Sequence, residues 1–349
     1  MEGIPTSLIN LKASWEELKT ENPKLRIRDA AKHLDVSEAE LLATGLGQNV
    51  VRLSTDFVDQ VKKFPRLEKV MSLTRSEGCV LEHKGRFQKI EIHGSAPHQV
   101  GTVIGPIEQR IFFNAWKYGF AVNSDTPRGP IFSLQYFDAQ GDAIMKVYLQ
   151  EKSDDDFAKT MVLEHLHKDQ VSALDPVPYA LPEYTSEDDL DKACFSSDWE
   201  NMKDTHDFFG MLRKYKLNRL NAVEWIGDNW AHQVDRLSAR QVVNTASETG
   251  LPIMIFAGNK GNIQIHQGKV KNIKQLGDWL NVMDPDFNMH LNEEVIDKAF
   301  VVHKNTVDGL VSALELFDKK GDMVCQFFGL RKPGIPQKEA WKELLDSLN

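Results

Sequence analysis

The sequence predicts an α+β protein built by tandem duplication, in which each half has N-terminal helices followed by a large antiparallel β-sheet. Two observations predict this class. Twice along the chain, a segment whose apolar residues recur at helical spacing is followed by β-rich runs separated by Gly, Pro, Asn and Asp. Motifs also recur in the same order in the two halves.

Three pairs of motifs carry the duplication, and their shifts differ by only a few residues. FDAQGD matches FDKKGD at 317 − 137 = 180, HKGRFQKIEIHG matches AGNKGNIQIHQG at 257 − 83 = 174, and SWEELK parallels DWENMK at 198 − 14 = 184. We therefore expect an N-terminal repeat at 1–165, an acidic, Pro-rich connector at 166–195 and a C-terminal repeat at 196–349. The period is far too long for a solenoid.

The first half begins with helices. Leu8, Leu11, Trp15 and Leu18 recur at helix spacing. Two short helices follow, and Ser37 with Glu40 forms a predicted capping box. The sequence of residues 55–75 also predicts a helix.

Strand-like runs follow from residue 79 to residue 151, and FDAQGD at 137–142 predicts a hairpin turn between two of them. Residues 153–170 are expected to be helical, before the connector.

Composition limits the classes of function. The chain has 349 residues, 41% of them hydrophobic and 27% charged, as in an ordinary globular protein with room for two domains. The net charge of −9 argues against binding to bulk nucleic acid or anionic membrane. Three widely spaced cysteines, no secretory signal and no apolar run long enough to span a membrane indicate a cytoplasmic protein.

The segment at 24–45 resembles a helix-turn-helix and carries several cations, so DNA binding is an alternative. Its turn has Asp35 instead of glycine, and the next helix is acidic, with Glu38 and Glu40. A structural helical hairpin is the better interpretation, and DNA binding is the weakest hypothesis.

The stretch from Trp199 to Arg219 reads as a helix carrying His206 between apolar neighbours. Met202 and Phe209 would share its face, and several cations follow. One imidazole in an aromatic-lined pocket with a cationic end suits haem, a flat, apolar dianion bearing iron. A structural histidine is the alternative. In the first repeat, the position equivalent to His206 is Asn22, since 206 − 184 = 22. The first repeat therefore lacks this histidine, and one principal site is expected.

The order and spacing of RIRDAAKHLDVSEAELLA, RIFFNAWKYGFAV, DTHDFF, FAGNKGNIQIHQG and SALELFDKKGD resemble the bacterial cytoplasmic haemin-degrading and haemin-transport family, over nearly the whole chain. The resemblance implies a duplicated α+β fold that holds haem b between helices and a sheet. His206 would be the proximal iron ligand, with the Met202 carbonyl or a carboxylate accepting its other N–H. Arg110 would be the catalytic residue on the distal face.

The resemblance further implies a haem-binding set that surrounds the ring. Its members are aromatic wall residues and cations for the two propionates, namely Phe256, Phe328, Arg219, Lys304 and Arg331. Each could instead be sheet core or a surface cation. Phe328 departs from the family, which commonly has tyrosine there, so a hydroxyl hydrogen bond is lost.

Two functions follow from this resemblance. The first is an enzyme that opens the porphyrin oxidatively and releases iron, with electrons from an external reductant. The second is a haem chaperone that passes haem to a separate haem oxygenase. No GxGxxG motif or P-loop is present, so no bound nicotinamide or flavin is expected. Possible partners are a haem-importer component, a reductase or a haem oxygenase, and the protein would be a monomer or homodimer.

Overall fold

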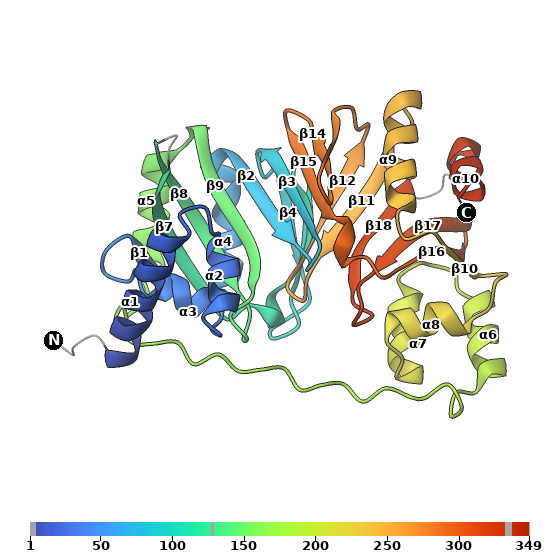
Figure 1. Cartoon of the computed structure of the whole chain (residues 1–349), viewed down its shortest axis with the longest axis horizontal. Helices are drawn as coiled ribbons and strands as arrows, with labels where there is room; N and C mark the ends of the chain where they lie inside the picture. Colours follow the sequence, from blue (N-terminus) through green and yellow to red (C-terminus); the bar gives the residue numbers. More distant parts are fainter. Residues whose placement is uncertain (1–4, 127–128, 332–336, 349) are drawn as a thin grey trace. The chain divides into compact units, whose positions relative to one another are not determined.

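The computed structural model describes residues 5–126, 129–331 and 337–348 and contains helices and two large antiparallel sheets (Figure 1). The chain forms two compact units. Unit 1 consists of Met1–Thr74, Glu82–Ala180 and Asn259–Gln264, and unit 2 consists of Arg75–Leu81, Leu181–Gly258 and Ile265–Asn349. Each unit therefore includes one short stretch from the other half of the sequence.

Unit 1 begins with helices and continues into antiparallel strands. Its strands follow the orders β1-β7-β8-β9-β2-β3 and β6-β5-β4. The elements are α1 Thr6–Glu21, α2 Ile27–His33, α3 Glu38–Ala43, β1 Val50–Leu53, α4 Phe57–Lys63, η1 Phe64–Leu67, β2 Glu68–Arg75, β3 Cys79–Gly85, β4 Lys89–His93, β5 Val100–Ile104, β6 Glu108–Phe112, η2 Phe113–Ala115, β7 Tyr118–Thr126, β8 Gly129–Phe137, β9 Ala143–Ser153 and α5 Asp155–Glu164.

Unit 2 repeats this plan, with strand orders β10-β16-β17-β18-β11-β12 and β15-β14-β13. Its elements are α6 Lys192–Glu200, α7 Asp207–Tyr215, α8 Arg219–Trp225, β10 Ala231–Val234, α9 Ser238–Thr249, β11 Ile253–Gly258, β12 Asn262–Gly268, β13 Ile273–Leu276, β14 Trp279–Met283, β15 Phe287–Asn292, η3 Glu293–Val295, β16 Lys298–Thr306, β17 Gly309–Phe317, β18 Met323–Gly329 and α10 Glu339–Asp346. The predicted α+β class and the duplication are confirmed.

The structure corrects one of the three repeat anchors. β7 and β16 begin at a shift of 298 − 118 = 180, and β3 and β12 at 262 − 79 = 183. The expected shift of 174 would instead place β4 on β12, although β4 is an edge strand like β13. The similar runs IEIH at 90–93 and IQIH at 263–266 caused the misalignment, whereas the His-x-Gly endings at 83–85 and 266–268 fit the structural shift, since 266 − 83 = 183.

Local signals at the N-terminus are confirmed. Glu40 N donates to Ser37 Oγ at 3.2 Å, and Ser37 N donates to the Glu40 carboxylate at 2.9 Å, so the capping box is complete. Asp35 adopts a positive φ of 54° in the turn between α2 and α3. Five of the six residues of α3 are buried, which leaves it no recognition face of the kind that DNA-reading helices present.

The helix expected over 55–75 is wrong in its second half. The chain is helical only to Leu67, and Glu68–Arg75 is β2, paired with β9. α4 ends at Lys63, just before Pro65 in the first turn of η1. Burial then alternates through Val70, Ser72 and Thr74, the period-2 pattern of a strand. The predicted FDAQGD hairpin turn does join β8 to β9, as FDKKGD joins β17 to β18.

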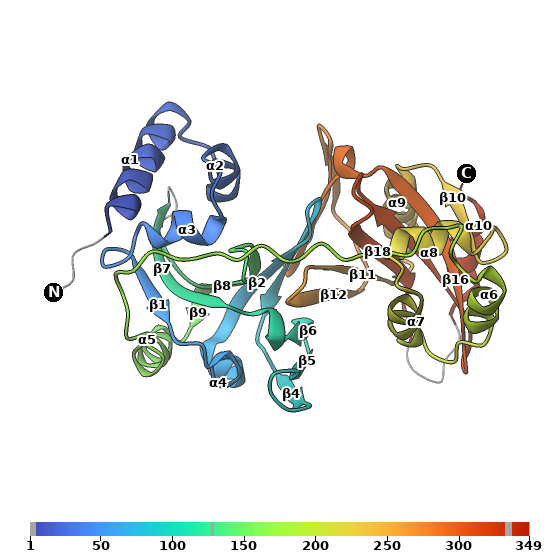
Figure 2. The ribbon, with the colours of Figure 1, turned by 90° about the horizontal axis from the view of Figure 1, so that it is seen from below.

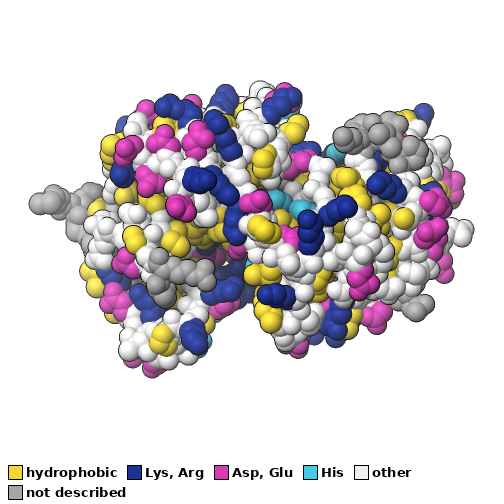
Figure 3. Space-filling model, turned by 90° about the horizontal axis from the view of Figure 1, so that it is seen from above, with side chains coloured by type: hydrophobic (Ala, Val, Ile, Leu, Met, Phe, Trp, Pro, Cys, Tyr) yellow, Lys and Arg dark blue, Asp and Glu magenta, His cyan; other side chains and the backbone are white. Residues whose placement is uncertain are grey.

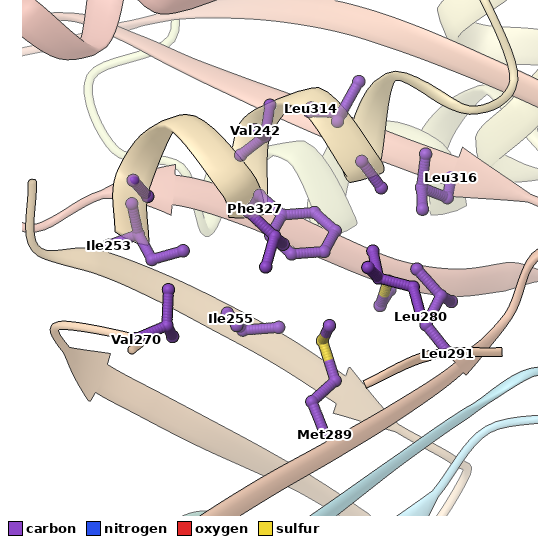
Figure 4. Packing of buried hydrophobic residues seen from close by; sticks show 14 of the residues in the cluster. Val242, Ile253, Ile255, Val270, Leu280, Met289, Leu291, Leu314, Leu316 and Phe327 are labelled. Carbon is purple, nitrogen blue, oxygen red and sulfur yellow. The ribbon is translucent and has the colours of Figure 1, made fainter. Parts of the chain in front are cut away.

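The β16-β17-β18-β11 sheet of unit 2 has two covered faces. Side chains on one face pack against α9 and α10, including Ile253, Ile255, Leu314, Leu316 and Phe327 (Figure 4). The free thiols of Cys79 and Cys325 lie in this same core. Alternate residues, including Phe300, Val302 and Phe317, pack on the opposite face against the layer of α6, α7 and α8 (Figure 2). This second face carries the candidate site.

Lysine and arginine side chains alternate with aspartate and glutamate on the face seen in Figure 3, without a continuous basic stripe there. None of the helices in the described part of the chain is both long and apolar enough to cross a membrane.

Candidate functional site

His206 lies at the N-terminal end of α7, directly before its first residue. The continuous helix expected from Trp199 to Arg219 is wrong, because α6 ends at Glu200 and α7 begins at Asp207. The Asp207 carboxylate accepts the backbone N–H groups of Lys203 and Asp204, both at 3.0 Å. These side-chain bonds to the backbone stabilise a turn in place of a helix.

The expected apolar setting of His206 is also wrong. Its side chain is 87% exposed, whereas Met202 is buried and Phe209 is 48% exposed, so the three residues do not share a face. The imidazole Nδ1 lies 2.5 Å from Asp204 Oδ1, which also accepts the backbone N–H of His206 at 2.8 Å. A carboxylate at Nδ1 favours the tautomer whose Nε2 carries the free lone pair of a metal ligand.

Asp204 connects this histidine to Arg331. The backbone N–H of His206 lowers the pKa of Asp204, and the imidazole and the charge of Arg331 lower it further. Arg331 Nη2 also lies 3.6 Å from Asp308 Oδ2. Arg331 thus pairs with Asp308, and its charge alone acts on Asp204, the carboxylate that holds His206.

Two other predicted site residues, Arg219 and Lys304, both bind a buried glutamate, Glu315, which was not among the predicted site residues. Glu315 on β17 is fully buried and accepts hydrogen bonds from Arg219 Nε at 2.8 Å, Arg219 Nη2 at 2.7 Å and Lys304 Nζ at 2.8 Å. Gln326 Nε2 adds a fourth at 3.0 Å. We call Arg219, Lys304, Glu315 and Gln326 the Glu315 cluster.

Burial and charge set the protonation of this cluster. Burial alone would raise the pKa of Glu315, but Arg219 and Lys304 outweigh it and lower the pKa to about 2. Burial lowers the pKa of Lys304 to about 8, and Arg219 acts in the same direction, against the attraction of Glu315. At neutral pH, two cations and one anion leave the cluster with one net positive charge.

Phe208 lies between the cluster and His206 in the sequence and contacts both cations. Its ring centroid is 4.9 Å from Arg219 Cζ and 4.3 Å from Lys304 Nζ, within cation–π range. Phe208 is buried, unlike its neighbour Phe209. The aromatic ring that holds the cations is therefore two residues from the exposed imidazole.

The predicted aromatic residues Phe256 and Phe328 lie on neighbouring strands of the same sheet. Their ring centroids are 5.2 Å apart in an edge-to-face arrangement, and both side chains are half-buried. Gln326 is two residues from Phe328 and pairs with both Glu315 and Phe256, so these side chains share one sheet face. Phe256 and Phe328 thus lie on the sheet face that carries Lys304 and Glu315.

Arg110 belongs to unit 1, on β6. Its Nη1 donates to the Gln109 carbonyl at 3.0 Å, and its Nη2 to Glu108 Oε1 at 3.2 Å. The side chain is 35% exposed. The guanidinium is held by its own strand and keeps access to solvent.

Sequence reasoning missed Asp204, Phe208, Glu315 and Gln326. A signal existed for Glu315, because a carboxylate in the run VSALELF falls where both neighbours are apolar. Such a buried charge requires partners. Among the described residues, no group of three or more His, Cys, Asp or Glu side chains could hold a metal ion by itself.

The fold and site define a duplicated α+β protein whose second unit combines one exposed, carboxylate-bound imidazole with buried cations and aromatic rings. A family model described as the haemin-degrading HemS.ChuX domain matches residues 35–165 and 216–348. The chain belongs to this family.

Individual relatives cover almost the whole chain. Hemin transport protein HmuS of Yersinia pestis is 33% identical over 341 residues, 97% of each chain. The crystal structure of holo-PhuS, a heme-binding protein from Pseudomonas aeruginosa, matches with a TM-score of 0.93 and 39% identity, over 98% of this chain and 99% of that chain. ChuS, an E. coli heme oxygenase, matches with a TM-score of 0.87 and 30% identity, over 97% and 99%.

Proposed function

We propose that the protein binds haem b at unit 2 and opens the porphyrin oxidatively, which releases the iron. One observation carries this proposal most directly. An exposed imidazole fixed by a carboxylate lies two residues from a buried aromatic ring that supports two cations. Haem requires this combination of an axial ligand, aromatic contacts and cations for its propionates.

Each residue of the site has a role in this proposal. His206 Nε2 is the iron ligand, and Asp204 holds the ring and raises its basicity. Arg219, Lys304 and Arg331 attract the two propionates, and Phe256 and Phe328 contact the porphyrin plane. Haem supplies the reactive iron, and an external reductant supplies electrons. The protein orients the ring and limits access of water.

Arg110 is the proposed catalytic residue. A guanidinium offers several N–H donors in a fixed planar arrangement and can donate hydrogen bonds to an oxygen ligand. Support comes from its partial exposure and its fixed position on β6.

A haem carrier in the cytoplasm is the second candidate function. Two relatives favour it, since one is named a hemin transport protein and another a heme-binding protein. A carrier needs the same residues for uptake but has no need of Arg110 for chemistry. It would deliver haem to a separate oxygenase.

Haemin titration tests the shared step. Apo-protein should develop a sharp Soret band that saturates at about one haem per chain. His206→Ala should weaken or shift this band, whereas the exposed His33→Ala in unit 1 should leave it unchanged. An identical spectrum and affinity for His206→Ala would refute the assignment of the iron ligand.

A second measurement separates the enzyme from the carrier. After addition of reductant, with catalase present, the enzyme should lose its Soret band and yield a tetrapyrrole product and free iron. Arg110→Ala should slow this loss while leaving haemin uptake largely intact. Reduced haem that persists and transfers to an added oxygenase would favour the carrier instead.

A further inference from the structure

Glu315 has a role that the haem-binding residues alone do not explain. Its two carboxylate oxygens accept four hydrogen bonds, two of them from a bidentate Arg219. Bidentate pairs restrict the orientation of the guanidinium as well as its position. The side chain of Arg219 keeps 16% of its surface exposed, whereas that of Glu315 has none. The carboxylate is thus enclosed by the protein, and of its two cationic partners Arg219 is more exposed than Lys304, whose side chain keeps 6%.

Unit 1 also buries an ion pair between the first residue of a short helix and a strand, but there the helix supplies the acid and the strand supplies the base. Glu38, the first residue of α3, forms an ion pair with Lys146 on β9. Arg219 is the first residue of α8 in unit 2, and Gln326 occupies the position of Lys146 at a shift of 326 − 146 = 180. The pair in unit 1 is neutral, whereas the Glu315 cluster has one net positive charge. Structural support for the short helix therefore does not require the extra cation.

We propose that Glu315 is a positioning residue that orients Arg219, with buried Lys304 beside it, toward a carboxylate of the ligand, so that unit 2 selects porphyrins with free propionates. The proposal rests on the proposed haem-binding function and adds a source of specificity to it. Glu315 does not touch the ligand itself. It holds two cations close together, which would otherwise repel each other, and the second cation supplies the net charge that an anionic ligand needs.

Two probes and one substitution test this role in the full-length protein. The probes are haemin and haemin dimethyl ester, which has the same iron and ring but no free carboxylate. Wild-type protein should bind haemin about ten- to a hundredfold more tightly than the ester, the range of one charged hydrogen bond. Glu315→Gln keeps the shape of the side chain but places an N–H₂ group against cationic donors. This variant should lose most of that preference and bind the ester as the wild type does.

Whether Glu315→Gln weakens or strengthens haemin binding distinguishes a positioning role from a purely electrostatic one. Glu315→Gln raises the net charge of the cluster, so a purely electrostatic role predicts tighter haemin binding, and that result would overturn the proposal. Glu293→Gln is the matched control, because buried Glu293 also holds an arginine, Arg240, at a different place in unit 2. The control should lose stability without losing the preference for haemin.

A measurement on the wild type keeps the proposal testable if Glu315→Gln does not fold. Lys304 should lose its proton as the pH rises through about 8, so the preference for haemin over the ester should decline there. Equal binding of both probes at every pH would overturn the role of Glu315 and leave haem binding standing. A wild type that takes up neither probe would overturn the proposed function and this inference with it.

Discussion

Asp204 accepts two hydrogen bonds from His206, one from its backbone N–H at 2.8 Å and one at its imidazole Nδ1 at 2.5 Å. The carboxylate therefore fixes both the position of the residue and the direction of its ring. Asp204→Ala should lower haemin affinity about 10- to 100-fold, the usual cost of losing the partner of a metal-bound histidine. Titration followed at the Soret band measures this, with Asp156→Ala, an exposed acid of unit 1, as the control. Unchanged affinity would show that His206 needs no carboxylate.

Phe328 provides a second test because the resemblance of the sequence to the family implies tyrosine at this place. The ring is half-buried and contacts Phe256 edge-on, so Phe328→Tyr can add a hydroxyl with little change in packing. We expect a stability change below about 1 kcal/mol, and a few-fold gain in haemin affinity if the hydroxyl forms one hydrogen bond worth about 1 kcal/mol. Urea unfolding and haemin titration measure the two effects. A loss of affinity would mean that this site is shaped for phenylalanine.

The Glu315 cluster predicts a pH-dependent difference in stability. The folded-state pKa of Glu315 is lowered to about 2 from the ordinary 4.5, so its stabilising effect is present above pH 4.5 and is lost as the pH falls toward 2. At pH 7, Glu315→Gln should lower the free energy of unfolding by about 3–5 kcal/mol, as expected when one partner of a buried ion pair is removed. This difference should shrink in acid, as chemical denaturation at several pH values can show. A difference independent of pH would contradict the lowered pKa.

Gly261 lies in Asn259–Gln264, the stretch from the second half of the sequence that belongs to unit 1, and a substitution there tests how tightly this stretch packs. Its carbonyl accepts the Phe112 backbone N–H at 2.9 Å and Trp116 Nε1 at 3.0 Å. An added Cβ would lie 2.5–2.8 Å from side-chain carbons of Ile144. Gly261→Ala should therefore destabilise the protein by about 1–3 kcal/mol, as overpacking does, with an altered Trp116 emission. Gly210→Ala, in the open part of α7, is the control and should stabilise slightly, by about 0.5–1 kcal/mol.

The sequence predicted those features that depend on local interactions. The capping box at Ser37 and Glu40 forms between neighbours in the chain, as does the FDAQGD turn, and both are correct. The strand β2 was missed because its partner β9 lies far away in the sequence, and that pairing outweighs local propensity. The interruption before His206 was missed because side-chain bonds from Asp204 and Asp207 replaced the helical ones.

The cations and the histidine of the candidate site were selected from the sequence, although Lys304 is buried. His206, Arg219, Lys304 and Arg331 were selected as cations or ligands, and all lie in unit 2. The carboxylates that hold them, Asp204 and Glu315, were not selected, since their importance depends on contacts with residues up to 96 positions away. Cations and a histidine can be selected by residue type, whereas the carboxylates that hold them become visible only in three dimensions.

The exchange of short stretches between the two halves affects how this molecule can be divided. A fragment starting at residue 181 would lack Cys79 and Leu81, which belong to the hydrophobic core of unit 2. Ser76, whose hydroxyl donates to the Val324 carbonyl at 2.6 Å, would be missing as well. A single cut in this chain therefore cannot yield two intact units.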